Sequence, residues 1–375
     1  MSKKEFKLGK KSRAVKSKKC RRLKMILLIT SGILMLALAG FLIWKFVFNA
    51  GEKSTDDDSV QVEPVRYFSP LTGMEIPDSD LADRTVFAVI IDNSVAARPQ
   101  SGLKEAGVVF EAVSEAGATR FVALYQEAEP EIIGPIRSVR SYYLEWVASF
   151  DPAVAHVGGS DEALTMINSG THGVSFNEFF HDTTFWRAQD RWAPYNTYTN
   201  FERLFKLAEV SDKTTSNFTG WARKDNGGWE CECSNEYEDI STCDCEQPIS
   251  RINIAISTGA FAVSYEYDES TNTFRRFQGG VPHVDREKGQ ISPNVVIAMR
   301  VNQTVALNGY TRIQAIGSGD VYIFQNGEVE RGRWQKDSAR SQLRFLDQND
   351  EEIKLNRGQT WITAVPQGRD VSWQR

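Results

Sequence analysis

The sequence predicts one N-terminal transmembrane helix, then an α/β ectodomain, then an antiparallel all-β domain. Three observations lead to this order. An uncharged apolar stretch follows a basic arm, strand-like and helix-like runs alternate up to about residue 210, and only strand-like runs follow residue 249. At 375 residues the chain is long enough for two domains that each bury a core.

The N-terminal arm, residues 1–24, holds twelve Lys or Arg and one acid, Glu5. Its charge of +11 leaves −16 for the rest of the chain, because the net charge is −5. Such an arm favours contact with anionic lipid headgroups. Only Phe6 could stack on a base within it, so we expect no nucleic-acid partner.

Residues 25–44, MILLITSGILMLALAGFLIW, carry no charge and would span roughly 30 Å as a helix, the thickness of a bilayer core. The sequence therefore predicts a transmembrane helix over residues 25–48. The basic arm would hold the N-terminus in the cytoplasm, which places everything after the helix outside the cell. The protein is then expected in the cell membrane, with a single pass.

A cleaved signal peptide is the alternative, since Ala37-Leu38-Ala39 matches a small-x-small cleavage site. Against it, the apolar run continues past this site to Trp44. The same stretch is similar to a bacterial lipoprotein signal, but Phe41 stands where the lipidated cysteine would be. Residues 49–63 are polar and acidic, which predicts a flexible tether.

Residues 64–210 are predicted to form the α/β domain. Four β-rich apolar runs, at 85–93, 107–115, 119–126 and 152–159, indicate a sheet covered on both faces. Residues 137–150 and 199–210 show helical spacing, with Val139, Tyr143, Trp146 and Phe150 on one helix face.

Residues 249–375 are predicted to form the antiparallel β domain. Seven strand-like runs follow one another here, and none has helical spacing. Asn326-Gly327 lies between two alternating runs. This dipeptide predicts a two-residue type I′ hairpin turn, because both positions need a positive φ.

Residues 211–248 form a predicted insert that contains Cys231, Cys233, Cys243 and Cys245. Outside the cytoplasm these cysteines favour two disulfides, with pairing left open among the possible connectivities. A four-cysteine zinc site is the alternative, but structural zinc usually takes a C-x₂₋₄-C spacing rather than C-x-C. We therefore predict no metal site and no cofactor.

Two arginines, Arg137 and Arg140, fall in the first turn of the predicted helix at 137–150. A helix N-terminus carries about half a positive charge, so cations there need a negative partner. That partner is either an internal carboxylate, such as Asp92, Glu111 or Glu115, or an anionic ligand clamped by the guanidinium groups.

A second candidate site is HVGGSDEA at 156–163, where a strand ends in two glycines before a helix. The free N–H groups of such a turn suit an anion. His156, Gly158, Gly159 and Ser160 are therefore candidate ligand-binding residues. Ser160 as a plain helix N-cap is the alternative, and it does not match a G-x-S-x-G nucleophile motif because Glu162 replaces the second glycine.

Several long motifs resemble the YerB-like lipoproteins of Gram-positive bacteria, a two-part domain of unknown function. They are PLTGMEIP (70–77), the stretch 91–121, GPIRSVRSYYLEW (134–146), HVGGSDEA (156–163) and FWRAQDRWAPYNTY (185–198), with RGRWQKD (331–337) and LNRGQTWITAVP (355–366) in the C-terminal part. The resemblance implies an envelope protein with no established reaction. Tyr195 departs from the pattern, because a histidine is expected there.

By motif position the resemblance adds further candidate binding residues. The full set is Asp92, Asn93, Arg98, Arg120, Arg137, Arg140, His156, Gly158, Gly159, Arg191 and Asn196.

Two functions follow as hypotheses. The first is a non-catalytic module that binds a small anionic ligand, a cell-wall ligand or an envelope partner through an arginine and glycine pocket. The second is a hydrolase or transferase that acts on wall polymers, with Asp92 as general base. The first is favoured, because no paired acid and base or nucleophile and base spacing stands out.

Overall fold

The computed structural model describes residues 25, 32, 35–45, 65–230 and 246–375. Residues 35–45 are helical, and Arg66–Arg375 form one compact unit. In the described part of the chain, no helix is both long and apolar enough to cross a bilayer. The predicted transmembrane helix is thus not supported here. The basic arm, the tether 49–63 and much of the 25–48 segment lie outside the described residues.

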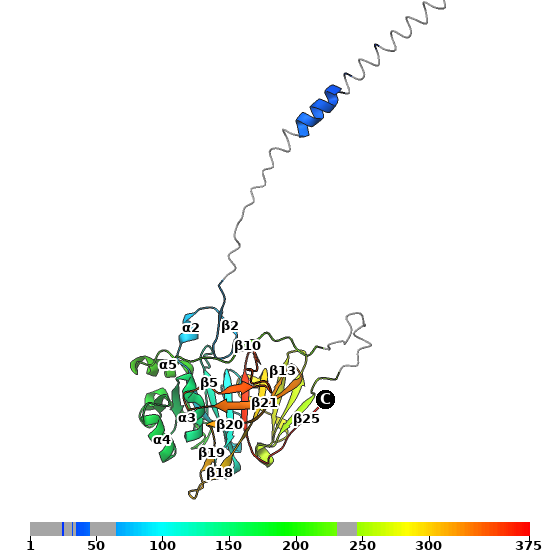
Figure 1. Cartoon of the computed structure of the whole chain (residues 1–375). Helices are drawn as coiled ribbons and strands as arrows, with labels where there is room; N and C mark the ends of the chain where they lie inside the picture. Colours follow the sequence, from blue (N-terminus) through cyan, green and yellow to red (C-terminus); the bar gives the residue numbers. More distant parts are fainter. Residues whose placement is uncertain (1–24, 26–31, 33–34, 46–64, 231–245) are drawn as a thin grey trace, which may run out of the picture. The chain divides into compact units, whose positions relative to one another are not determined.

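A ten-stranded sheet forms the centre of the compact unit (Figure 1). In spatial order its strands are β22 (Arg344–Leu346), β21 (Glu328–Lys336), β20 (Gly317–Gln325), β17 (Val295–Val301), β24 (Thr360–Pro366), β4 (Val108–Val113), β5 (Thr119–Tyr125), β3 (Phe87–Asp92), β6 (Ala153–His156) and β7 (Val174–Asn177). Strands from both predicted domains therefore share one sheet.

A five-stranded antiparallel sheet is the second layer of strands. Its order is β14 (Val281–Pro282), β13 (Thr273–Gln278), β12 (Val263–Asp268), β11 (Arg251–Ile254) and β25 (Val371–Gln374). Short pairs complete the strands: β1 (Tyr67–Phe68) with β2 (Glu75–Ile76), β8 (Trp186–Arg187) with β9 (Thr197–Tyr198), β10 (Arg223–Lys224) with β23 (Leu355–Asn356), β15 (Val284–Asp285) with β16 (Gly289–Gln290), and β18 (Gln303–Val305) with β19 (Thr311–Ile313).

The helices of the compact unit are few and short. They are α2 (Asp80–Asp83), α3 (Ser141–Val147), α4 (Asp161–Asn168) and α5 (Phe201–Val210), with 3-10 turns η1 (Val95–Ala97), η2 (Glu115–Gly117), η3 (Ala148–Phe150), η4 (Asp182–Thr184) and η6 (Gly259–Phe261). In Figure 1, α3, α4 and α5 gather at one end of this unit, and β13 and β25 lie at the other. The fold is mixed α/β with a large β-rich C-terminal part.

Both faces of the central strands are buried, and alternate side chains enter two separate cores. In β3, Ala88 and Ile90 join the core beneath α3 and α4, whereas Val89 and Ile91 join the core shared with α5 and the five-stranded sheet. Because side chains on a strand alternate between faces, a strand covered on both sides must be apolar throughout. This explains the continuous apolar runs of the sequence.

The prediction that the C-terminal part is antiparallel throughout is wrong, because β23 pairs parallel with β10 and β24 has two parallel neighbours. β24 pairs parallel with β17 on one side and parallel with β4 on the other. Both neighbours are buried strands, so β24 lies in the middle of the sheet. Strand composition predicted the strands themselves but could not show which edges meet, since pairing across such separations is decided by tertiary packing.

The predicted helix at 137–150 begins later than expected, at Ser141, with Arg140 as its N-cap. The preceding residues are held in an extended segment instead. The N–H of Arg137 donates to the carbonyl of Ile90 at 2.9 Å, and that of Val139 donates to Gly158 at 3.1 Å. Arg137 is therefore not in a helical turn. By contrast, the turn at Asn326-Gly327 is confirmed, with φ of 54° and 68°.

We expect Trp361→Ala to destabilise the whole compact unit. Trp361 is fully buried in β24 and packs edge-on to Phe121 at 5.4 Å. Removing such a side chain costs about 3–5 kcal/mol. Urea unfolding of the full-length protein in detergent should show one transition by fluorescence and circular dichroism, shifted to lower urea.

The matched control is Trp192→Ala, since Trp192 is exposed. Its effect should stay within about 0.5 kcal/mol. A second transition that Trp361→Ala leaves unmoved would show that the two parts unfold independently, contrary to a shared sheet.

Candidate functional site

The candidate site lies where parallel strands β3, β6 and β7 end, at Asp92, His156 and Asn177. In open α/β sheets, ligands bind in the crevice outside the carboxyl ends of parallel strands. Most of the predicted site residues lie on loops that leave this edge. The contacts of each one decide what it can offer to a ligand.

Asp92 and Arg137 form an ion pair at this edge. Oδ2 of Asp92 lies 2.7 Å from Nε of Arg137. Oδ1 accepts hydrogen bonds from the backbone N–H and the hydroxyl of Ser94, both at 2.8 Å. The Arg137 guanidinium also lies 5.6 Å from the ring centre of Tyr195, the residue that replaces the expected histidine. Oδ1 is thus hydrogen-bonded, whereas Oδ2 is buried in ion contact with Arg137 without a well-aligned hydrogen bond.

Glu115 neutralises two further arginines, Arg120 and Arg140. Nε of Arg140 donates to Oε1 of Glu115 at 2.5 Å, and Nη2 of Arg120 lies 3.3 Å from Oε2. Burial by itself raises the pKa of Glu115, but the hydrogen bond from Arg140 and the charges of both arginines outweigh it, so the pKa is lowered. Nη1 of Arg140 donates to the carbonyl of Val139 and Nη1 of Arg120 to that of Ser138, whereas Nε of Arg120 is buried without a hydrogen-bond partner.

Asn93 is fully buried and all of its side-chain polar atoms are bonded. Its Nδ2 donates to Oγ1 of Thr119 at 2.6 Å, and its Oδ1 accepts from Gln100 at 2.9 Å and from Nε of Arg98 at 3.1 Å. Arg98 also donates to the carbonyls of Asn93 and Ala260. Burial lowers the pKa of Arg98 to about 10. No carboxylate among the described residues pairs with this guanidinium.

Arg191 and Asn196 belong to the loop before β9. Arg191 donates to the carbonyls of Ala97 and Pro99, both at 2.5 Å. Asn196 accepts from Nη1 of Arg187 at 3.3 Å. These contacts hold the loop against residues 97–99, so Arg191 serves the fold rather than an open pocket.

The HVGG segment is also structural in its contacts. His156 is buried and bonds through Nδ1 to the carbonyl of Gly158 at 2.8 Å and through Nε2 to Ser175 at 3.0 Å. Gly158 has φ of 58°, and a Cβ there would lie 3.0 Å from the ring of Phe179. Ser160 is the N-cap of α4, as the alternative interpretation expected. At Gly159 a Cβ would collide with Val139, 2.8 Å away.

Internal partners therefore occupy the arginines at this edge, and an open pocket of free guanidinium groups does not form among the described residues. Arg137, Arg120 and Arg140 meet carboxylates, whereas Arg98 and Arg191 meet mainly carbonyls. A hollow of about 210 Å³ does adjoin Arg140 and Ser160, but Asp161 and Glu162 also line it. Whether any of these residues binds a ligand stays a prediction.

Sequence reasoning missed a buried polar network beneath Asn93. Oε2 of Glu111 lies 2.5 Å from Nη2 of Arg276, and both side chains are 0% exposed. Gln100 extends the network to His283, whose Nε2 lies 3.0 Å from Oε1 of Gln100. One signal was available, because the alternation in TFRRFQ places Arg276 on the same face as Phe274.

A group of exposed aromatic side chains was also missed. Phe179, Phe180 and Trp192 are 66%, 79% and 89% exposed. Arg187 ties their two loops together, since it donates to Glu178 at 2.7 Å and to Asn196 at 3.3 Å. We call Phe179, Phe180 and Trp192 the aromatic rim. Its sequence signal was an apolar Phe-Phe pair set between polar residues.

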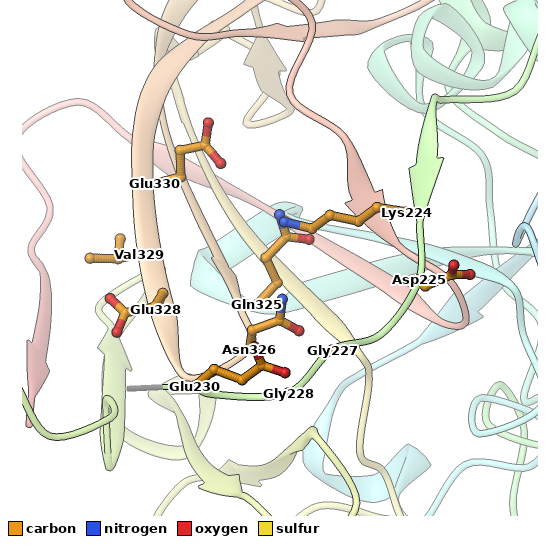
Figure 2. Close-up of a pocket in the computed structure, with 10 residues that line it drawn as sticks. All are labelled: Lys224, Asp225, Gly227, Gly228, Glu230, Gln325, Asn326, Glu328, Val329 and Glu330. Carbon is orange, nitrogen blue, oxygen red and sulfur yellow. The ribbon is translucent and has the colours of Figure 1, made fainter. Parts of the chain in front are cut away.

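A separate hollow of about 350 Å³ lies between β10 and the β20–β21 turn (Figure 2). Lys224 and Asp225 line one wall, and Gln325, Glu328 and Glu330 the other. Burial raises the pKa of Glu330. No three His, Cys, Asp or Glu side chains within the described ranges are grouped to hold a metal ion. The predicted disulfide residues Cys231, Cys233, Cys243 and Cys245 lie outside the described residues.

We expect Glu115→Gln to destabilise the protein by roughly 1.5–3 kcal/mol at pH 7, because two arginines lose a charged partner. The pKa of Glu115 is lowered on folding, so its contribution is present above its unfolded pKa and disappears as the pH falls through the folded value. Urea unfolding at pH 7 and pH 3 should show the difference from the parent shrink at the lower pH. An exposed control, Glu202→Gln, should change little, and a pH-independent difference would contradict the ion pairs.

His156 should be neutral at pH 7, with a pKa near 4 caused by burial. Below about pH 6.5 the unfolded chain binds a proton that the folded chain does not, so this group reduces stability as the pH falls towards 4, by about 3 kcal/mol at most. Proton NMR titration of the His156 ring in the full-length protein measures the pKa directly. A value near 6.5 would contradict the buried, doubly bonded ring.

Known proteins resemble this chain in sequence and in fold. The profile described as "Protein of unknown function (DUF3048) N-terminal domain" matches residues 71–215, and that of the C-terminal domain matches residues 252–362. A relative from Bacillus subtilis (strain 168), named "Putative lipoprotein YerB", is 28% identical over 328 residues, which cover 86% of this chain and 93% of the relative.

The crystal structure of the YerB protein from Bacillus subtilis has the same fold. It matches with a TM-score of 0.70 and 26% sequence identity over 82% of this chain and 99% of that one. The two matched stretches contain Asp92, Arg137, Glu111 and Arg276, and hence both the ion pair at the sheet edge and the buried network. The chain belongs to the DUF3048 family and is YerB-like over most of its length.

Proposed function

We propose that this chain is a non-catalytic binding protein of the bacterial envelope, and that its aromatic rim holds an uncharged wall glycan. The observation that carries the proposal is the exposure of Phe179, Phe180 and Trp192 beside the carboxyl ends of β3 and β6. Large aromatic side chains left in water at a functional edge are typical of binding sites.

Envelope location rests on the relative and on the N-terminal sequence. The relative is named as a lipoprotein, and this chain carries the uncharged stretch 25–44 in place of a lipidated cysteine. We propose that residues 25–48 anchor the chain in the cell membrane, with the basic arm on the cytoplasmic side and against anionic headgroups. The compact unit would then face the wall.

The rim suits sugar rings because its rings are flat, apolar and open to solvent. Phe179 packs against Gly158, and Arg187 fixes the spacing between the loops that carry Phe179 and Trp192. An aromatic side chain contributes a large contact area at little entropic cost, and its face attracts the weakly positive C–H edge of a sugar. Neighbouring Glu178 and Asn196 supply polar groups for hydroxyls.

Charge narrows the choice of partner. The chain outside its basic arm carries −16, which repels wall polyanions and anionic lipids over most of the surface. The arginines that might attract them locally are paired with Asp92 and Glu115. An uncharged glycan therefore fits better than the anionic ligand expected from the arginine pocket. An envelope protein partner on the same rim is the competing binding proposal.

The enzymatic alternative, with Asp92 as general base in a hydrolase or transferase, has less support. Ser94 donates two hydrogen bonds to Oδ1 of that carboxylate, and Oδ2 is buried at 2.7 Å from the cationic Arg137. A general base must reach the proton that it abstracts, and His156, the nearest imidazole on this edge, is buried with both nitrogens bonded.

The test is co-sedimentation of the full-length protein in detergent with purified peptidoglycan sacculi stripped of teichoic acids. We expect the parent to sediment with the sacculi, and Phe179→Ala/Phe180→Ala/Trp192→Ala to lose at least ten-fold in affinity, because the stacking faces are removed. All three side chains are exposed, so the variant should remain folded.

Leu307→Ala with Val210→Ala is the control, since both side chains are exposed apolar groups away from the rim. It should bind like the parent. Equal binding by the rim variant would refute the glycan site, and so would binding to phosphatidylglycerol vesicles but not to sacculi.

A further inference from the structure

We propose that a hollow between the loop at Arg98-Pro99 and the β13–β14 hairpin binds a small α-amino carboxylate with an apolar side chain, such as an N-acylated amino acid or the carboxyl end of a peptide. The hollow measures about 180 Å³. This is below the roughly 300–1,000 Å³ of pockets for drug-sized molecules, so its ligand must be small. The site is separate from the aromatic rim and does not depend on it.

Two side chains that line the hollow are almost fully buried and lack partners. Gln278 is 2% exposed, and neither its Oε1 nor its Nε2 makes a hydrogen bond. His283 is 4% exposed, and its Nδ1 is also unbonded. Each buried polar group without a partner costs about 1–3 kcal/mol, so a fold keeps such groups only for a reason.

The hydrogen-bonding character of His283 follows from its neighbour. Nε2 of Gln100 donates to the carbonyl of Asp92 at 3.0 Å and to Oδ1 of Asn93 at 2.9 Å. The Oε1 of Gln100 must then accept, so the Nε2 of His283, 3.0 Å away, carries the proton. Burial and the charges of Arg276 and Arg98 hold the pKa of His283 well below its usual value. Its Nδ1 is therefore a hydrogen-bond acceptor without a donor in the protein, and it can accept from an N–H or O–H group of a ligand.

Arg98, in contrast to the Nδ1 of His283, offers free hydrogen-bond donors. Its described bonds use one N–H on each of Nε, Nη1 and Nη2, which leaves two of the five N–H groups free. The ring of Phe261 covers it at 5.0 Å, and the charges of Glu111 and Asp92 act on it only from beyond ion-pair distance, so no described carboxylate is in direct contact with it. A partly buried guanidinium without a counter-ion favours a carboxylate from a ligand.

Together these groups match one chemical class. A carboxylate can meet Arg98 and the Nε2 of Gln278, while an adjacent N–H meets the Nδ1 of His283 or the Oε1 of Gln278. The other walls are apolar and consist of Pro99, Val281, Pro282 and Val284. They leave space for a small aliphatic side chain and exclude a charged one.

Entry requires a small movement, because the unpartnered atoms are shielded from bulk water. The hairpin can supply it. Gly279 and Gly280 form the turn between β13 and β14, with φ of 62° and 81°, and a Cβ at Gly280 would meet open space. Glycine tolerates such backbone conformations without steric cost. The turn thus permits the end of β13, which carries Gln278, to adjust around a ligand.

The experiment is saturation-transfer NMR of the full-length protein in detergent with N-acetyl-L-valine, L-valine and N-acetyl-L-valinamide. N-acetylvaline should bind, and the amide, which has the same shape without the carboxylate, should bind at least ten-fold more weakly. Valine tests whether a free amino acid suffices or a peptide-like N–H is needed. Absence of binding by both carboxylates, or equal binding of the amide, would overturn the proposal.

Gln278→Leu should abolish binding of N-acetylvaline while leaving the melting temperature unchanged or higher, because no internal hydrogen bond is lost. The matched control is Gln325→Leu. Gln325 is equally buried, but it donates to the carbonyl of Lys354 at 3.0 Å and accepts from the N–H of Asn356 at 2.8 Å. This control should melt earlier and still bind. A Gln278→Leu variant that binds like the parent, or that loses as much stability as the control, would refute the site.

Discussion

The buried ion pair between Glu111 and Arg276 is the interaction on which the rest of the structure depends. It joins β4 of the ten-stranded sheet to β13 of the five-stranded sheet, across 165 residues of sequence. Removing two charges from water is expensive, and a pair repays this only when further groups surround it. Here Asn93 and Thr119 donate to the carboxylate, and the guanidinium lies 4.6 Å from the ring centre of Trp361. Compensation is incomplete, because Nε and Nη1 of Arg276 are buried without a hydrogen-bond partner. The pair fixes how the two sheets face each other.

The hydrogen-bond network around the Glu111 and Arg276 pair extends to the edge of the large sheet. The side chain of Asn93 serves the Glu111 network, while the residue before it, Asp92, turns its carboxylate to Arg137. The polar side chains at the end of β3 therefore contact charged groups of the protein itself. The arginines that the sequence offered as ligand clamps contact internal carboxylates and carbonyls, which connect the loops at this edge to the sheet and to one another.

The two proposed sites differ in chemistry and in accessibility. The aromatic rim is open, apolar and without an unpaired charge of its own, which suits an extended uncharged polymer. The hollow at Arg98, Gln278 and His283 is small, and its buried unpartnered groups match a carboxylate with a neighbouring N–H. The residues at this hollow come from both matched halves of the chain. The hollow thus exists only where the N-terminal loop and the C-terminal hairpin meet, which the Glu111 and Arg276 pair brings about.

Apolar periodicity and turn chemistry act locally, and they were enough to predict β3, β4, β5, β6, β17, β20, β21 and β24, helix α5 and the Asn326-Gly327 turn, and to predict α3 with a start four residues too early. Strands β7, β22 and β25 were not predicted. The sequence also identified Asp92 and Glu115 as possible partners of Arg137 and Arg140. Only the tertiary structure decided that β24 lies parallel between β17 and β4, that those carboxylates are indeed the partners, and that Gln278 and His283 approach Arg98. These facts depend on contacts between residues tens to hundreds of positions apart or on the direction of single side chains. Local propensity carries no information about either.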